Sequence, residues 1–177
     1  MTTYDAERLR QLVSGLSAAG SATARGRRLQ ELIAFLIEPL PGIEITDENI
    51  FNISRTEEKD VWLRHAREAA GMPFDDREIP VECKNEKVKT GPADISWFGE
   101  KIRNSGGRDG LLLTAAGLSG DIQSGGHEEI RNQLRKGTRI IVITVDDVVG
   151  LREGADFLAL LQARHAELRH LQGYRSI

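Results

Sequence analysis

The segment IPVECKN, residues 79–85, decides the fold that we expect for this chain. Its apolar residues alternate with other residues, which predicts a β-strand with one apolar face. The alternating apolar positions are Ile79, Val81 and Cys83. Glu82 and Lys84 are two residues apart, so a strand points both side chains to the face opposite the apolar one. A carboxylate and an ammonium group side by side on that face need an explanation.

The composition is that of one globular domain. The chain has 177 residues, of which 40% are hydrophobic and 29% charged, enough for a sizeable core. A single cysteine, Cys83, excludes an intrachain disulfide and favours a plain thiol in a reducing compartment. The N-terminal stretch lacks the apolar core of a signal peptide, and no apolar run reaches membrane-spanning length. We therefore expect a soluble, cytoplasmic protein with no membrane partner.

The charge is modest overall and uneven along the chain. A net charge of −3 argues against a protein that coats nucleic acid through bulk positive charge. Residues 1–30 contain five arginines against two acids, a local charge of +3. Residues 31–60 contain eight acids against two bases, a local charge of −6. Such an acidic segment is either a solvated surface or part of a site for a cation.

Hydrophobic periodicity predicts an α/β fold. Two helices come first, three extended segments follow, and helices then alternate with buried strands. This order predicts an antiparallel meander joined to a parallel part, in a central mixed β-sheet flanked by helices. The expected helices are 4–16, 25–38, 91–107, 127–137 and 154–172, and the expected strands lie in 43–53, 59–66, 79–85, 109–117 and 138–145.

Three charged residues are expected to meet at one place on this sheet. Asp60 opens the second strand, and Glu82 lies near the end of the third. If these strands pair as a hairpin around the loop 67–77, the two carboxylates come close together and Lys84 joins them. Two converging carboxylates are the oxygen ligands that Mg²⁺ prefers. A lysine beside the metal could hold or deprotonate a water and offset charge on a phosphate.

This arrangement resembles the PD-(D/E)xK nuclease superfamily, whose restriction-endonuclease-like fold has the core order αβββαβ. The resemblance covers the chain from about residue 25 to the last helix. The superfamily signature, an acid on the second core strand and E-x-K on the third, corresponds here to Asp60 and to Glu82-Cys83-Lys84. A glutamate on the first core helix completes many such sites, and Glu31 fits that position. The segments 52–66 and 107–120 look most like Mrr-type restriction endonuclease-like proteins.

The resemblance implies a metal-dependent nuclease that hydrolyses phosphodiester bonds in DNA, in a restriction or defence role. It implies Mg²⁺ or Mn²⁺ held by Asp60, Glu82 and Glu31, with Lys84 completing the catalytic set. DNA is then the main partner. A homodimer would supply two sites for double-strand cutting, and a partner protein would supply sequence specificity.

Two departures and two other functions stay open. Lys59 stands where the superfamily often has proline, and the long gap from Asp60 to Glu82 leaves Asp75 and Asp76 as weaker candidates for the motif acid. The other functions are a non-catalytic module that binds nucleic acid or a partner on the same fold, and a structure-specific junction resolvase. The alternative to a catalytic role for Glu82 and Lys84 is an exposed ion pair that contributes little to stability.

Several further residues have two interpretations each. Glu31 is either a metal ligand or a solvated helix residue, and Trp97 either stacks on a base or packs inside. Cys83 is interpreted as a buried apolar residue rather than a nucleophile. A set of cations forms either a basic rim for phosphates or a solvated face: Lys87, Lys89, Lys101, Arg103 and Arg108. Residues 1–20 form an N-terminal helix that could serve oligomerisation, and residues 21–177 form the nuclease domain.

Overall fold

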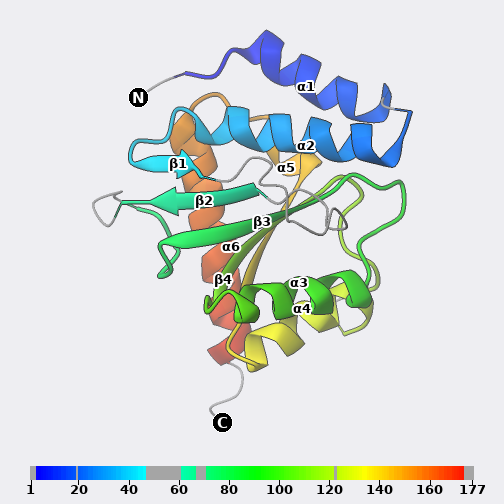
Figure 1. The fold of residues 1–177 in the computed structure, drawn as a ribbon, viewed down its shortest axis with the longest axis vertical. Helices are drawn as coiled ribbons and strands as arrows, with labels where there is room; N and C mark the ends of the chain where they lie inside the picture. The colour runs from blue at the N-terminus through cyan, green and yellow to red at the C-terminus, as the bar shows by residue number, and fades with distance from the viewer. Residues whose placement is uncertain (1–2, 19, 47–60, 67–70, 122, 174–177) are drawn as a thin grey trace, which may run out of the picture.

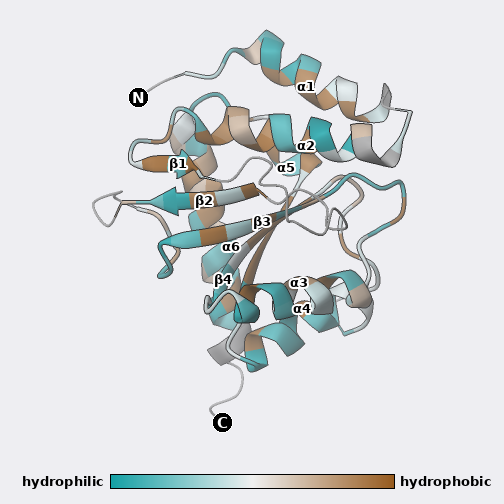
Figure 2. Ribbon diagram, viewed as in Figure 1, coloured by the Kyte–Doolittle hydropathy of each residue, from teal (hydrophilic) through white to brown (hydrophobic). Residues whose placement is uncertain are grey.

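The computed structural model of the chain describes residues 3–18, 20–46, 61–66, 71–121 and 123–173. A five-stranded mixed β-sheet lies at the centre, with helices against it (Figure 1). Apolar residues are concentrated in the strands and in parts of the helices (Figure 2). The predicted α/β class with a mixed sheet and flanking helices is therefore confirmed.

The observed order of elements matches the predicted order, with one short helix added. The helices are α1 (Ala6–Ala18), α2 (Ala22–Ile37), α3 (Pro92–Asn104), α4 (Gly125–Arg135), α5 (Val145–Val148) and α6 (Gly154–Gly173). The strands are β1 (Ile43–Ile45), β2 (Val61–His65), β3 (Glu78–Lys84), β4 (Asp109–Thr114) and β5 (Arg139–Thr144). The strand expected within 43–53 is therefore described only in its first part, since residues 47–60 lie outside the described segments.

The sheet has the strand order β1-β2-β3-β4-β5. The first three strands form an antiparallel meander, in which Val61 of β2 lies opposite Val81 of β3. β4 and β5 then join in parallel, and Glu82 lies beside Leu112 of β4. β3 is thus the strand at which the sheet changes from antiparallel to parallel, as the sequence predicts. The parallel strands need long crossovers, which α3 and α4 provide.

One face of the sheet is covered by α3 and α4. Gly110 of β4 lies beneath α3, and a Cβ at this position would come within 2.9 Å of the Phe98 ring. The absence of a side chain at Gly110 lets α3 approach the strand closely. All six residues of β4 are buried, as expected for a strand covered on both faces.

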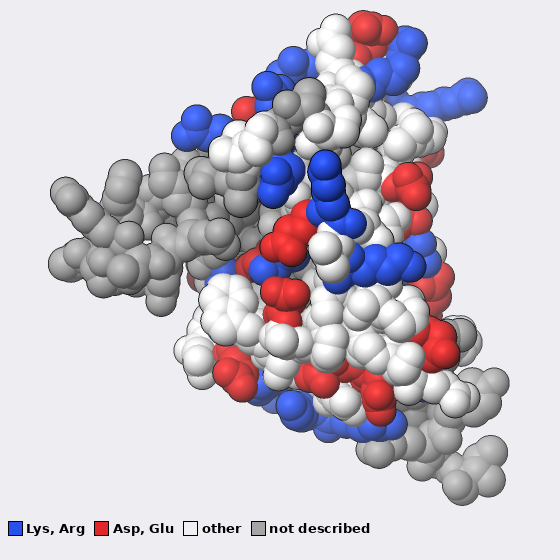
Figure 3. Space-filling model, turned by 90° about the vertical axis from the view of Figure 1, so that its right-hand side faces the viewer, with Lys and Arg blue, Asp and Glu red and all other residues white. Residues whose placement is uncertain are grey.

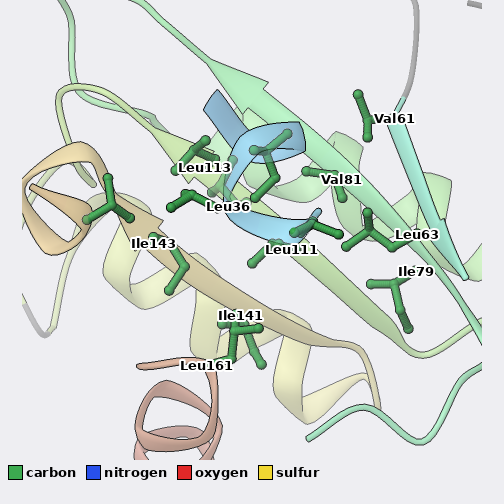
Figure 4. Close-up of a cluster of buried hydrophobic side chains, with 14 of the residues drawn as sticks. Leu36, Val61, Leu63, Ile79, Val81, Leu111, Leu113, Ile141, Ile143 and Leu161 are labelled. Carbon is green, nitrogen blue, oxygen red and sulfur yellow. The ribbon is translucent and has the colours of Figure 1, made fainter. Parts of the chain in front are cut away.

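The opposite face carries α2 and part of α6. Figure 4 shows Leu36 of α2 close to Leu111 and Leu113 of β4. α6 packs against the edge strand β5. Leu161 packs near Ile141 on one face (Figure 4), and further along α6 Leu168 lines a cavity with residues of the other face.

α1 packs on α2 rather than standing apart (Figure 1). Leu9, Leu12 and Leu16 are buried in the same hydrophobic cluster as the rest of the core. The Tyr4 hydroxyl, ahead of α1, donates a hydrogen bond of 2.6 Å to the Leu36 carbonyl, and burial together with the charge of Asp156 raises the pKa of Tyr4. The apolar side of α1 is therefore used within the chain, and a role in oligomerisation stays a prediction.

The strand expected over 138–145 ends at Thr144 because a short helix begins there. The Thr144 hydroxyl accepts a hydrogen bond from the Asp147 amide at 3.3 Å, and the Asp147 carboxylate accepts from the Thr144 amide at 2.8 Å. This reciprocal pair is a capping box, which fixes the first turn of α5. The T-x-x-D pattern at residues 144–147 carries this signal within the apolar strand segment.

Candidate functional site

The last residues of β3 carry the candidate site. Glu82 and Lys84 point to the sheet face that α3 covers, because both form ion pairs with side chains of that helix. Cys83 points the other way and packs against the hydrophobic core. Burial and the charge of Glu82 raise the pKa of the Cys83 thiol, so it stays protonated at neutral pH. Cys83 therefore packs as an apolar residue, as predicted, but it is partly rather than fully buried.

Glu82 is a buried carboxylate between two lysines. The residue is 7% exposed. Its Oε1 lies 3.5 Å from Lys84 Nζ, and its Oε2 lies 3.6 Å from Lys101 Nζ. A carboxylate in such a place needs compensating charge, and the two ammonium groups supply it. Glu82 and Lys84 are therefore not the exposed, weakly interacting ion pair that was the alternative to a catalytic role.

Lys84 has a second carboxylate partner. Its Nζ lies 3.1 Å from Asp94 Oδ1, and its side chain is only partly exposed. Burial on its own would lower the pKa of Lys84, but the bond to Asp94 and the charge of Glu82 outweigh it and raise the pKa above its usual value. Lys84 is therefore a protonated cation at neutral pH.

Asp94 is placed by the start of α3. Gly91 is the N-cap and Pro92 the first helical residue, a position that proline favours. The Oδ2 atom of Asp94 accepts a hydrogen bond of 3.4 Å from the Gly91 amide, while Oδ1 faces Lys84. One carboxylate thus caps the helix and orients the lysine.

Lys101 lies deeper than a surface cation. Its Nζ is 5.3 Å from the centroid of the Trp97 ring and 6.0 Å from that of Phe98. Trp97 itself is 51% exposed, beside a fully buried Phe98. The aromatic contacts and Glu82 together hold the ammonium group against the sheet.

The structure does not place all five candidate rim residues on one open basic surface. Lys101 is held by Glu82, and Arg103 donates hydrogen bonds to Gln133 at 2.6 Å and to Thr138 at 3.0 Å. Both are therefore structural cations. Figure 3 views the side on which β3 ends, and positive and negative side chains alternate there.

The other predicted ligands are not brought to Glu82 within the described residues. Asp60 lies outside these residues. Glu31 is exposed on α2 and borders a cavity with Arg8 and Ile43. In the described part of the chain, no hydrogen bond or ion pair joins Glu31 to Glu82 or Lys84.

Asp75 and Asp76, the weaker candidates for the motif acid, take part in a different cluster. The Asp109 carboxylate accepts hydrogen bonds from both of their amides, at 2.8 and 3.0 Å. Arg139 binds Asp109 through two nitrogens and also binds Asp75 at 2.6 Å, which lowers the pKa of Asp75. Asp109 begins β4, whereas Glu82 lies near the end of β3, which runs parallel to β4. Asp75 and Asp76 therefore belong to a cluster that joins the starts of β4 and β5, away from Lys84.

Sequence reasoning did not assign Asp94 and Lys101 to the site. A signal for them exists on the helix, because residues 94, 98 and 101 have the i, i+4, i+7 spacing of one helical face. Phe98 at the centre of that face is buried, so its charged neighbours also approach the sheet. The sequence signal for such residues is therefore two charges on the apolar side of a helix that lies next to a strand with the E-x-K pattern.

The described residues supply part of the expected metal site. In the segments that the structure describes, no group of three or more His, Cys, Asp or Glu residues could hold a metal ion. Glu82 has the hard oxygen donors that Mg²⁺ and Mn²⁺ require. The chemistry of the donors therefore fits, and the described residues supply one of the two strand carboxylates expected.

No protein-family model and no curated protein matches this chain. Among the described helices, none has the length and apolar character needed to cross a membrane.

Proposed function

We propose that this chain is a metal-dependent nuclease that hydrolyses phosphodiester bonds in DNA. The observation that carries the proposal is the buried Glu82 with Lys84 beside it on the same face, near the end of the third strand of an α/β mixed sheet. A carboxylate and a protonated lysine held at a sheet end are the groups that a PD-(D/E)xK nuclease uses. A restriction or defence role, in a homodimer or with a specificity partner, follows from the same resemblance.

Glu82 and Asp60 are proposed to hold Mg²⁺ or Mn²⁺, with Glu31 as a third acid from the resemblance alone. Val61 of β2 pairs with Val81 of β3. In the sequence, Asp60 immediately precedes Val61, and Glu82 immediately follows Val81. When bound, the metal supplies Lewis-acid stabilisation of the phosphate and a more acidic water. Of the two strand acids, Glu82 is the one whose surroundings are described.

Lys84 is proposed to act as a fixed positive charge. Because its pKa is raised, it is protonated at neutral pH and would not accept a proton from water. It would donate hydrogen bonds to the attacking water or to a phosphate oxygen, and so offset the negative charge that builds up in the transition state. Asp94 keeps the lysine in place and is a positioning residue.

The decisive experiment is cleavage of supercoiled plasmid in the presence of Mg²⁺ or Mn²⁺. We expect metal-dependent nicking by the unmodified protein and a loss of about 100-fold or more in Lys84→Ala and Glu82→Gln, the scale on which removal of one electrostatic stabiliser acts. Glu78→Gln is the matched control for Glu82, because Glu78 lies on the same strand but is exposed and paired with Arg64. Lys136→Ala is the exposed control for Lys84, because Lys136 lies at the end of α4 and is not one of the candidate rim residues.

A second candidate, the non-catalytic binding module, is favoured by one observation. Both oxygens of Glu82 already face ammonium groups, as they would in a charge cluster that only stabilises the fold. If the folded protein binds DNA but neither nicks it nor binds Mn²⁺ in a calorimetric titration, the binding module replaces the nuclease. Cleavage of four-way junctions but not of linear or supercoiled duplex would instead identify a junction resolvase.

A further inference from the structure

A cavity of about 620 Å³ lies between α4, α6, the edge strand β5 and the loop after β4. None of its lining residues belongs to the Glu82 cluster. Its apolar wall is formed by Leu118, Ile130, Ile140, Val142 and Leu168. Cavities of this volume with mostly apolar walls and a few polar groups are typical of small-molecule sites.

The acids of this cavity are already neutralised. Arg164 Nη2 lies 2.7 Å from Asp147 Oδ1, and Arg164 Nη1 lies 3.0 Å from Glu167 Oε2. These contacts raise the pKa of Arg164 against the effect of its burial, and hydrogen bonds from Thr144 and Arg164 lower the pKa of Asp147. Arg164 thus pairs with both acids of the cavity through its two terminal nitrogens, while its Nε atom is buried without a hydrogen-bond partner among the described residues.

Arg131 of α4 has no such partner. It lines the same cavity, and its Nε atom is buried. Among the described residues, this nitrogen has no hydrogen-bond partner. A buried guanidinium N–H without an acceptor is unfavourable, and a permanently charged group without a counter-charge more so. The cavity thus has apolar walls and, beside the exposed Lys89, a cation whose buried N–H has no partner in the described chain.

We propose that this cavity binds a small molecule with an apolar body and a single anionic group, such as a carboxylate, which Arg131 receives. The apolar body would contact Leu118, Val142 and Leu168, and the anion would accept the free N–H of Arg131. A single negative charge fits best, because Asp147 and Glu167 also border the cavity and would repel a second one. The proposal goes beyond the nuclease function and does not depend on it.

The probe for this site is 1-anilinonaphthalene-8-sulfonate, an aromatic body with one sulfonate in place of the carboxylate. Titration of the folded protein is expected to give saturable binding of one probe per chain. Arg131→Gln is expected to weaken the binding about tenfold or more, the effect of losing a hydrogen bond to a charged group. N-phenyl-1-naphthylamine, which has the same rings without the sulfonate, is expected to bind about tenfold more weakly than the sulfonate.

The matched control is Arg135→Gln. Arg135 lies one turn further along α4 and is exposed, with a hydrogen bond of 2.7 Å to Asn132, so this change removes the same charge outside the cavity. It is expected to leave the affinity for the sulfonate unchanged. Leu118→Trp keeps every charge but adds volume at the cavity wall, and it is expected to reduce binding.

Because the probe also binds loosened proteins, each variant must first match the near-ultraviolet circular dichroism of the unmodified protein. If Arg131→Gln fails that comparison, Arg131→Lys replaces it, since it keeps the charge and removes the Nε donor. The proposal is overturned if Arg131→Gln binds as tightly as Arg135→Gln, if the neutral probe binds equally well, or if Leu118→Trp has no effect.

Discussion

Lys101 Nζ lies 3.6 Å from Glu82 Oε2, which joins the middle of α3 to the end of β3. Both side chains are largely shielded from water. In such surroundings the loss of one partner leaves a charge without its compensation, and this costs more than the pair contributes when intact. The pair therefore gives the helix a fixed position over the sheet.

Lys101→Met is expected to lower the free energy of unfolding by about 3 kcal/mol, the low end of the range for breaking a buried pair, because Lys84 still neutralises Glu82. In the double variant Glu82→Gln/Lys101→Met the two losses should not add, and a coupling of about 1 kcal/mol or more is expected. Urea denaturation of the four proteins measures it. Simple additivity within error would show that the two groups do not interact.

Asp109→Asn is expected to cost about 3 kcal/mol or more in urea denaturation. Asp109 is 1% exposed and receives two backbone amides and two nitrogens of Arg139. The substitution removes the charge that compensates this arginine. Asp75→Asn is the control, because the Asp75 side chain is 79% exposed and pairs with the same arginine. Its loss is expected to stay below about 1 kcal/mol, and equal losses would contradict the assignment of Asp109 as the centre of the cluster.

Asp147 gives the stability a dependence on acid. Its pKa is lowered in the folded protein, because hydrogen bonds from Thr144 and Arg164 favour the carboxylate over the effect of burial. Its contribution is therefore fully present above the ordinary value of 3.8 and is lost as the pH falls below it. The stability difference between the unmodified protein and Asp147→Asn, about 1–2 kcal/mol at neutral pH, should shrink as the pH is lowered below 3.8. A difference that stays constant as the pH is lowered would exclude the carboxylate as its source.

Two helical glycines are expected to respond in opposite directions to alanine. A Cβ at Gly99 of α3 would overlap the side-chain amide of Gln133 on α4, which is completely buried. At Gly26 of α2 no atom lies within 4 Å of the added carbon. Gly26→Ala should therefore stabilise the protein by up to about 1 kcal/mol through helix propensity.

Gly99→Ala should gain the same propensity yet destabilise the protein by about 1–3 kcal/mol through overpacking. Thermal unfolding followed by circular dichroism gives both values. If the two variants shift the melting temperature in the same direction, the close contact between α3 and α4 is not a constraint on packing.

Most of the fold was predictable because its signals are local. The alternation in residues 79–85, the continuous apolar runs of β4 and β5 and the glycines after the helices each lie within one element. The order of these elements then leaves few topologies, and the mixed sheet is one of them. The end of β5 was predicted one residue late, because a capping box is a small signal within an apolar segment.

The candidate site was predictable only as far as one strand defines it. Glu82 and Lys84 share a strand face by simple alternation, and the structure brings them together as predicted. Asp94 and Lys101 depend on how closely α3 approaches β3, which is set partly by Gly110 on a third element. Such contacts join residues far apart in sequence, so the helical spacing of residues 94, 98 and 101 indicates the buried face of α3 but not the strand residues that it meets. Asp60 stays a prediction, because it lies outside the described residues.

The position of α6 along β5 has a consequence for aggregation. β5 is an edge strand with the sequence RIIVIT, a short apolar segment rich in β-branched residues, and such segments readily pair with strands of other molecules when exposed. α6 packs against this strand. Shortening or loosening α6 would therefore expose β5 to pairing with strands of other molecules. A destabilising change in α6 would reduce the yield of folded protein before it altered any binding or chemistry.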